Sequence, residues 1–330
     1  MGGGTAAACI LQSDQTKSPL LERCVMEVPA IETTTPVVKS GRPRSIRWSY
    51  TLTSWLGLVP FLLFCLLFEL LPALVIIQGS VTTDQGALTF NNYQRVISQA
   101  STLRAFQTSI SISLVTAIIG AVFGFLAAYG VYNLRASWLR NFLIGFSSIA
   151  ANFAGVPLAY AFISTLGVTG FVTVLLHNWF HINLYDLGFN LYNFWGLVLA
   201  YTYFQLPLMI LVMVPALSAL RPEWREAATN LGASSFTYWR RVALPVLLPS
   251  IIAATMLLFA NSFGAYATAF ALAQGNINLV TILISFVVAG NVDYDPGLGN
   301  AMAVGMIIVL LVAVSLYTVM LRRVSIWQGR

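Results

Sequence analysis

The sequence predicts an all-α membrane protein with six transmembrane helices. Of its 330 residues, 58% are hydrophobic and only 8% are charged, and the mean hydropathy is +0.80. Soluble domains contain about 25% charged residues because their surface faces water. This chain has too little polar surface for that, so we expect a lipid bilayer around it. For the same reason we expect no nucleic-acid partner, although the net charge is +6.

Six stretches are long and apolar enough to cross a bilayer, which takes about 20 residues. They are Trp55–Ile77, Thr108–Tyr132, Phe142–Leu166, Phe194–Leu217, Val246–Ala271 and Leu298–Leu321. The third contains Asn152, Gly155 and Pro157, and the fourth contains Gln205 and Pro207. Membrane helices tolerate such residues where neighbours satisfy the freed backbone groups.

The basic residues indicate the orientation of these spans. With six spans, 15 of the 17 Lys and Arg residues fall on one side of the membrane, and only Arg95 and Arg104 fall on the other. Cytoplasmic loops carry the excess of basic residues in membrane proteins. We therefore expect both termini to be cytoplasmic.

The connection between the fourth and fifth spans, 221–245, predicts two short helices joined by a tight turn. Pro222 suits the first position of a helix, and Gly232 suits a left-handed helix end. Ser234 or Ser235 can cap a second helix, which we expect to end before Pro245. We call this connection the elbow, and the charge pattern puts it on the cytoplasmic side.

The residues of the elbow resemble the EAA loop of ABC-importer permeases. Glu226-Ala227-Ala228 is followed after three residues by Gly232, and Leu244-Pro245 closes the pattern. Val242 stands where the family more often has Ile, and the remaining spacing fits. The similarity extends over roughly 103–321, and the full spacing is far more specific than Glu-Ala-Ala alone. Without the spacing, these residues would be read as the caps of an ordinary loop helix.

The resemblance implies a MetI-like ABC permease fold with a cytoplasmic EAA coupling helix, in the plasma (inner) membrane of a bacterium. In that family two permease subunits form the pathway, ABC ATPase subunits dock on the elbows, and an external solute-binding protein delivers the solute. Here the resemblance implies a distinct homologue as the second permease. The residues it assigns to ATPase coupling are Glu226, Ala227, Ala228, Gly232, Leu244 and Pro245.

The chain itself has no means of hydrolysing ATP. A phosphate-binding Walker loop requires a lysine in the pattern Gly-x-x-x-x-Gly-Lys-Ser/Thr. The only lysines are Lys17 and Lys39, and neither lies in such a pattern. We therefore expect a non-catalytic translocation subunit that binds no cofactor, with ATP and Mg on the partner ATPase.

Together with the resemblance, the sequence predicts that the chain has four parts. We predict a disordered cytoplasmic N-terminal tail over 1–47, which is polar and without periodicity. The first transmembrane helix and an external loop follow over 48–103. The ABC permease transmembrane domain covers 104–321, and 322–330 forms a cytoplasmic C-terminal tail.

Polar residues within the spans are candidates for the solute pathway, because such residues face the protein interior or a water-filled cavity. Glu69 is the only charged residue well inside a span; it either contacts a cationic solute or partner helix, or is a carboxyl near the outer boundary. The other candidates serve either solute contact or helix packing. They are Asn152, Tyr160, Gln205, Asn261, Ser262 and Tyr266.

The solute is indicated only by weak features. The stretch from Asn261 to Thr268 resembles the Ser-Phe/Leu-Gly-Ala segment of polyamine-type permeases, which implies a polyamine or a related small organic or ionic solute. His177 and His181 are spaced to bind a metal on a helix. The aromatic residues between them favour an external segment at the membrane boundary instead, and we predict no metal site.

The alternative function is an ion- or proton-coupled secondary transporter. Such proteins carry ionisable residues in several spans, whereas Glu69 is the only one here. A membrane enzyme is disfavoured because the spans contain no paired His, Asp or Cys residues.

Overall fold

The computed structural model describes residues 58–83, 86–273, 276–289 and 294–328. The chain divides into two compact units, Met1–Val59 and Pro60–Arg330. Nearly all described residues belong to the second unit, and the predicted tail over 1–47 lies outside them. The described residues are almost entirely helical, and the single β-bridge among them pairs Thr82 with Leu88.

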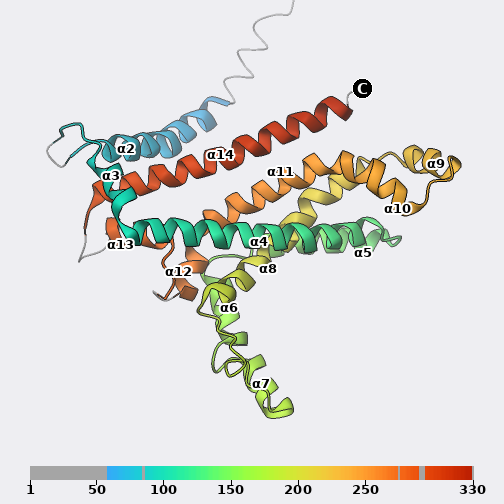
Figure 1. The fold of residues 1–330 in the computed structure, drawn as a ribbon, viewed down its shortest axis with the longest axis horizontal. Helices are drawn as coiled ribbons and strands as arrows, with labels where there is room; N and C mark the ends of the chain where they lie inside the picture. The colour runs from blue at the N-terminus through green and yellow to red at the C-terminus, as the bar shows by residue number, and fades with distance from the viewer. Residues whose placement is uncertain (1–57, 84–85, 274–275, 290–293, 329–330) are drawn as a thin grey trace, which may run out of the picture. The chain divides into compact units, whose positions relative to one another are not determined.

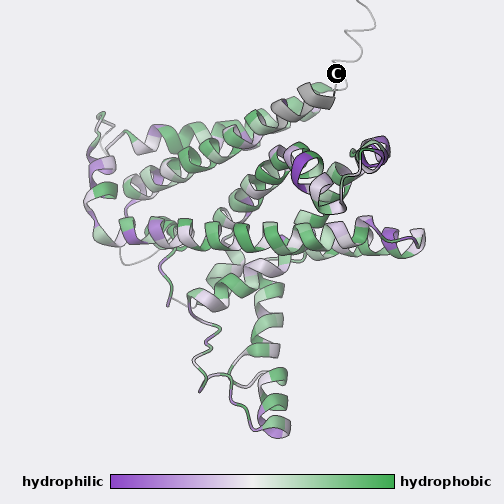
Figure 2. Ribbon diagram, turned by 45° about the vertical axis from the view of Figure 1, so that its right-hand side comes forward, coloured by the Kyte–Doolittle hydropathy of each residue, from purple (hydrophilic) through white to green (hydrophobic). Residues whose placement is uncertain are grey.

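Six segments of the described chain are long and apolar enough to cross a membrane. They are Leu58–Ser80, Ala100–Tyr132, Val156–Phe180, Phe194–Ser218, Ser235–Phe263 and Pro296–Met320. Figure 2 shows that hydrophobic residues cover the long helices, while hydrophilic residues gather in the short helices at their ends. The predicted all-α fold with six spans is confirmed.

Helix α4 (Ala100–Tyr132) is the centre of the bundle (Figure 1). It packs against α8 (Phe194–Ser218) and α11 (Leu244–Phe263), and α11 in turn packs against α14 (Pro296–Gln328). The close approach of α4 and α8 depends on small residues. A Cβ added at Gly124 would lie 2.5 Å from the Cβ of Met209, and one at Gly120 would lie 2.9 Å from the Cβ of Gln205. Small residues at this spacing let membrane helices approach closely.

The first span contains a π-helical turn directly before a Leu-Pro pair. The turn η1 (Leu66–Leu70) precedes α2 (Leu71–Ser80), and the Leu71 N–H donates to the carbonyl of Leu66. Proline lacks an N–H and its ring crowds the preceding turn. One wider turn accommodates this crowding without ending the helix. Helix α2 packs against α14.

The third span differs from the prediction of one helix over 142–166. The chain instead forms α5 (Ser137–Asn152) and α6 (Val156–Leu166), separated by three residues. Gly155 has φ 78° and ψ −150°, a conformation that essentially only glycine adopts. Pro157 follows in the first turn of α6. The membrane-length apolar segment then continues from α6 into α7 (Phe171–Phe180).

The fifth span also differs, since a single helix over 246–271 was expected. It begins earlier, at Ser235, and ends at Phe263. After Gly264, Ala265 and Tyr266, a new short helix begins, α12 (Ala267–Ala273). The Tyr201 hydroxyl of α8 donates to the carbonyl of Ala265 at 2.8 Å. This bond satisfies a backbone group that the break releases inside the protein, as a membrane interior requires.

The segment between the fifth and sixth spans contains a helix that was not expected, α13 (Val280–Ala289). It is too short to cross a bilayer. It packs against α4 and α14, and the Ser109 hydroxyl of α4 accepts a hydrogen bond from the Val280 N–H at 2.9 Å. Its hydrophobic composition is explained by this packing.

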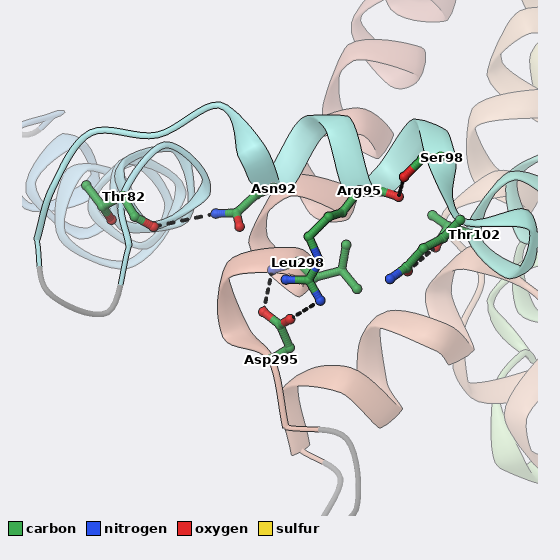
Figure 3. A network of polar contacts seen from close by, with 8 residues as sticks. Thr82, Asn92, Arg95, Ser98, Thr102, Asp295 and Leu298 are labelled. Carbon is green, nitrogen blue, oxygen red and sulfur yellow. Dashed lines mark hydrogen bonds and ion pairs between the residues drawn. The ribbon is translucent and has the colours of Figure 1, made fainter.

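Polar contacts hold the short helix α3 (Asn91–Ser98) to the start of α14 (Figure 3). Arg95 forms an ion pair with Asp295 at 2.6 Å. The second carboxylate oxygen of Asp295 accepts from the Leu298 N–H at 3.0 Å, which caps α14. The amide of Asn92 donates to the carbonyl of Ser80 at 3.1 Å, so α3 is also tied to the end of α2.

Candidate coupling elbow and pathway cavity

The elbow consists of two short helices joined by a glycine turn. Helix α9 (Pro222–Asn230) begins with Pro222 in its first turn, as predicted. Gly232 has φ 75°, and its N–H donates to the carbonyl of Thr229 while that of Ala233 donates to Ala228. These two bonds form a Schellman motif, which needs a left-handed residue at the position of Gly232.

We predicted that the second helix of the elbow ends before Pro245. In the structure it continues past this residue. Helix α10 (Ser235–Tyr238), capped by the Ser234 side chain, runs through the π-helical turn η2 (Trp239–Ala243) directly into α11. The Leu244 N–H donates to the carbonyl of Trp239 across this wider turn. The turn accommodates Pro245 in the same way as η1 accommodates Pro72 in the first span. Leu244 is 43% exposed, and Pro245 is exposed in the first turn of α11.

Helix α9 has one face toward the bundle and one toward its surroundings. Trp224 and Ala228 are half-buried and pack on the hydrophobic cluster formed by α4, α8 and α11. Glu223, Glu226 and Ala227 are exposed. Residues three and four apart share a helix face, so the Glu-Ala-Ala triplet is divided: Glu226 and Ala227 point outward, and Ala228 points inward.

Aromatic packing fixes the elbow to the end of α4. The Trp239 ring lies edge-on to Tyr129 at 5.0 Å and to Phe125 at 6.5 Å between ring centroids. Tyr238 is buried beside them. Arg240 and Arg241 therefore lie at the same end of α4 as Arg135, while Arg95 precedes the other end of this 33-residue helix.

A cavity of about 400 Å³ lies where the third and fifth spans are interrupted. It is lined by the end of α5 and Gly155, by Phe204 of α8, by Ala260 and Asn261 of α11, and by the residues from Gly264 to Thr268. The Thr268 hydroxyl bridges the two interruptions, since it accepts from the Gly155 N–H at 2.7 Å and donates to the Gly155 carbonyl at 3.2 Å. None of the residues that line the cavity is charged.

Asn261 and Tyr266 are the predicted pathway residues that line this cavity. Asn261 is exposed to it, and the Tyr266 hydroxyl lies 2.9 Å from that of Ser285 in α13. Asn152 is next to the cavity wall in sequence, and its amide donates to the Ser148 carbonyl of its own helix at 2.8 Å. The interruption of the third span lies at Asn152, Gly155 and Pro157, the residues that interrupt this stretch in the sequence, whereas the interruption of the fifth span at Gly264 was not predicted.

The other pathway candidates lie elsewhere. Gln205 is fully buried, and its amide donates to the Leu258 carbonyl at 2.8 Å. Ser262 is buried with its hydroxyl 2.9 Å from that of Thr116. Tyr160 is 63% exposed on α6, and Glu69 is exposed on the first span. The contacts of Gln205 and Ser262 hold α11 to α8 and α4.

The two histidines do not share a helix face. His177 is in the last turn of α7, and His181 follows the helix with a left-handed φ of 55°. The described residues contain no group of three His, Cys, Asp or Glu side chains placed to hold a metal.

Comparison with known proteins matches this chain to membrane components of transport systems. The model of the family described as "Binding-protein-dependent transport system inner membrane component" matches residues 47–326. The sulfate transport system permease protein CysT of Salmonella typhimurium is 29% identical over 245 residues, covering 72% of this chain and 82% of the relative. The spermidine/putrescine permease PotC of Haemophilus influenzae is 24% identical over 197 residues, covering 58% and 69%.

Among solved structures, the chain is similar to one from a bacterial alginate ABC transporter in complex with an alginate pentasaccharide-bound periplasmic protein. The TM-score is 0.64 at 17% sequence identity, and the match covers 85% of this chain and 98% of the other. At this identity the similarity concerns the fold.

Proposed function

Because this chain belongs to the family of binding-protein-dependent transport system inner membrane components, we propose that it passes a small oxyanion, of the sulfate type, across the bacterial inner membrane. It is a multi-pass permease subunit of an ABC importer and does not itself catalyse a reaction. Its partners are ATPase subunits, a second permease and an external solute-binding protein.

We choose an oxyanion as the solute because the lining of the cavity is uncharged. The Asn261 amide and the Tyr266 hydroxyl are hydrogen-bond donors, and oxyanions accept hydrogen bonds from such groups. A polyamine that leaves water needs carboxylates around its ammonium groups, whereas an oxyanion needs cationic groups or several N–H and O–H donors, and the lining offers donors of the latter kind. No carboxylate lines the cavity, and relatives that match most of this chain are named sulfate permeases.

A polyamine is the second candidate solute. Glu69 is a carboxylate inside the first span and is exposed on it. The relatives named PotB and PotC belong to spermidine/putrescine systems. On this alternative, Glu69 contacts the solute, and the pathway includes the surface of the first span as well as the cavity.

We also propose how the subunits of the transporter are arranged. The elbow and both termini are cytoplasmic, as the excess of basic residues at one end of α4 supports. The elbow contacts the ATPase through Glu226 and Ala227, and Gly232 gives the turn its shape. ATP and Mg are bound by the ATPase and not by this chain. The second permease is a distinct homologue, as the separate names PotB and PotC suggest for polyamine systems.

The test is solute uptake by proteoliposomes that contain the assembled complex. We expect uptake of labelled sulfate that requires the binding protein outside and ATP on the ATPase side. Competition by molybdate and none by spermidine would support the oxyanion class, whereas uptake of spermidine alone would overturn it. An ATPase subunit unable to hydrolyse ATP should abolish uptake. Uptake that survives this change but stops when the proton gradient is removed would identify a secondary transporter instead.

A further inference from the structure

A small polar chamber lies inside the bundle, next to the interruption of the fifth span. Its walls come from α4, α8, the end of α11 and the start of α13, and no charged residue lines it. Five of its lining residues carry a hydroxyl, namely Ser109, Ser113, Tyr201, Ser262 and Thr281. All but Thr281 are buried, with at most 5% of each residue exposed. Hydroxyls buried inside a membrane protein need hydrogen-bond partners.

The chamber is separate from the cavity of about 400 Å³ described above. Asn261 and Gly264 line the cavity, whereas Ser262 and Phe263 line the chamber, and Ala265 borders both. The interrupted segment of the fifth span therefore forms the wall between the two spaces. The chamber has a volume of about 10 Å³, which is close to the minimum of about 10–15 Å³ that one water molecule needs. No transported solute fits in it.

Three hydroxyls of the chamber keep hydrogen-bonding capacity after the bonds that they form with other described residues. The Ser113 hydroxyl donates to the Ser109 carbonyl at 2.7 Å, so its oxygen has lone pairs left to accept. The Tyr201 hydroxyl donates to the Ala265 carbonyl at 2.8 Å and can accept in the same way. The Ser109 hydroxyl oxygen accepts from the Val280 N–H at 2.9 Å, so its proton is left to donate.

The hydroxyl of Ser262 is a third acceptor in the chamber. Thr116 has a single hydroxyl proton, which it donates to the Ile112 carbonyl at 2.8 Å. In the 2.9 Å contact between the hydroxyls of Thr116 and Ser262, the donor is therefore Ser262, and its lone pairs stay available. The chamber thus combines one free donor, on Ser109, with three acceptors, on Ser113, Tyr201 and Ser262.

We propose that the chamber binds one water molecule, which accepts from the Ser109 hydroxyl and donates to two of the three acceptor hydroxyls. Buried waters typically form about three hydrogen bonds, so this site satisfies one water completely. The water joins α4, α8 and α11 where α11 ends, and in this way it supports the wall of the cavity. A sodium ion is disfavoured because no carboxylate lines the chamber and an unpaired buried charge is costly. The inference does not depend on which solute is transported.

The first test is a high-resolution structure of the unsubstituted protein in its assembled complex. We expect an isolated density peak at about 2.7–3.2 Å from the hydroxyl oxygen of Ser109 and from at least two of the three acceptor oxygens. Absence of this peak, in a map that shows ordered water elsewhere in the protein interior, would overturn the proposal.

The second test measures the Tm of Ser113→Ala. The hydroxyl of Ser113 donates only within its own helix, so in a dry chamber the substitution should leave the Tm unchanged or raise it slightly, since Ala favours helix. With a bound water, one of its acceptors is lost, and we expect the Tm to fall by about 2 °C or more. Ser218→Ala is the matched control, because the Ser218 hydroxyl donates to the Val214 carbonyl of its own helix at 2.9 Å, away from the chamber. An equal Tm for the two variants would overturn the proposal.

A third measurement distinguishes water from a cation. The Tm of the unsubstituted protein is compared in sodium chloride and in choline chloride at the same ionic strength. A bound water predicts the same Tm in both salts. Stabilisation by sodium that Ser113→Ala removes would identify a cation site and overturn the assignment of water.

Discussion

Glu226 and Ala228 are two residues apart and face opposite ways on α9. Glu226 is exposed, whereas Ala228 packs against the bundle together with Trp224. The triplet therefore joins two different surfaces, and substitutions in it should have different effects. At the outward position they should change partner binding, and at the inward position they should change the attachment of the elbow.

We predict that Glu226→Ala together with Gly232→Val uncouples the permease from its ATPase without preventing insertion into the membrane. Val at position 232 would be strained at φ 75°, at a cost of about 1–2 kcal/mol, and open space around the residue confines the effect to the turn. Solute-stimulated ATP hydrolysis and the yield of membrane protein are measured together. Normal yield with normal stimulation would contradict the role of this turn.

A single hydroxyl links the interruptions of the third and fifth spans. Thr268→Val removes both of its bonds to Gly155 and leaves two backbone groups without this partner. We expect a loss of about 1–3 kcal/mol in stability, seen as a lower Tm of the purified protein. Thr255→Val is the control, because the Thr255 hydroxyl bonds only within its own helix, to Ile251 at 2.8 Å. Equal shifts for the two variants would argue against a specific link.

At the scale of the helices, the packing of α4 on α8 depends on the absence of side chains at particular positions. Gly124→Ala should destabilise the protein, since the new Cβ would lie 2.5 Å from the Met209 Cβ and overpacking costs about 1–3 kcal/mol. Gly130→Ala in the same helix meets nothing within 4 Å and should be neutral or slightly stabilising. Thermal unfolding of the two variants tests this, and an equal Tm would contradict the close packing.

The number of spans and the elbow could be predicted from sequence because they depend on local signals. Hydrophobic length identifies spans, and Pro222, Gly232 and Ser234 each act within one turn of the chain. The interruption at Gly264 could not be predicted, because it is stabilised by a tyrosine from another helix, Tyr201. Continuation of the helix through Pro245 was missed because hydropathy does not reveal a π-helical turn. Sequence alone does not separate pathway residues from packing residues, since burial of Gln205 and exposure of Asn261 depend on how the helices pack.

At the scale of the whole molecule, the distribution of basic residues predicts which end of the bundle is cytoplasmic. Cysteines are introduced singly at Ser234 and at Leu187 in a chain without its natural cysteines. An impermeant thiol reagent added to intact cells should label position 187 and leave position 234 unlabelled until the membrane is opened. Labelling of position 234 from outside would reverse the topology and remove the elbow from the reach of a cytoplasmic ATPase.

The π-helical turn before Pro245 has a mechanical consequence. Because the chain does not break there, one continuous 29-residue helix extends from Ser235 in the elbow to Phe263 beside the cavity. At about 1.5 Å per residue this helix is roughly 40 Å long. A tilt imposed at its elbow end is therefore passed along the helix toward Asn261, with the π-helical turn and Pro249 as the two places where the helix can bend. If the proposed function is correct, movement of the ATPase at the elbow changes the cavity around Asn261 through this one helix.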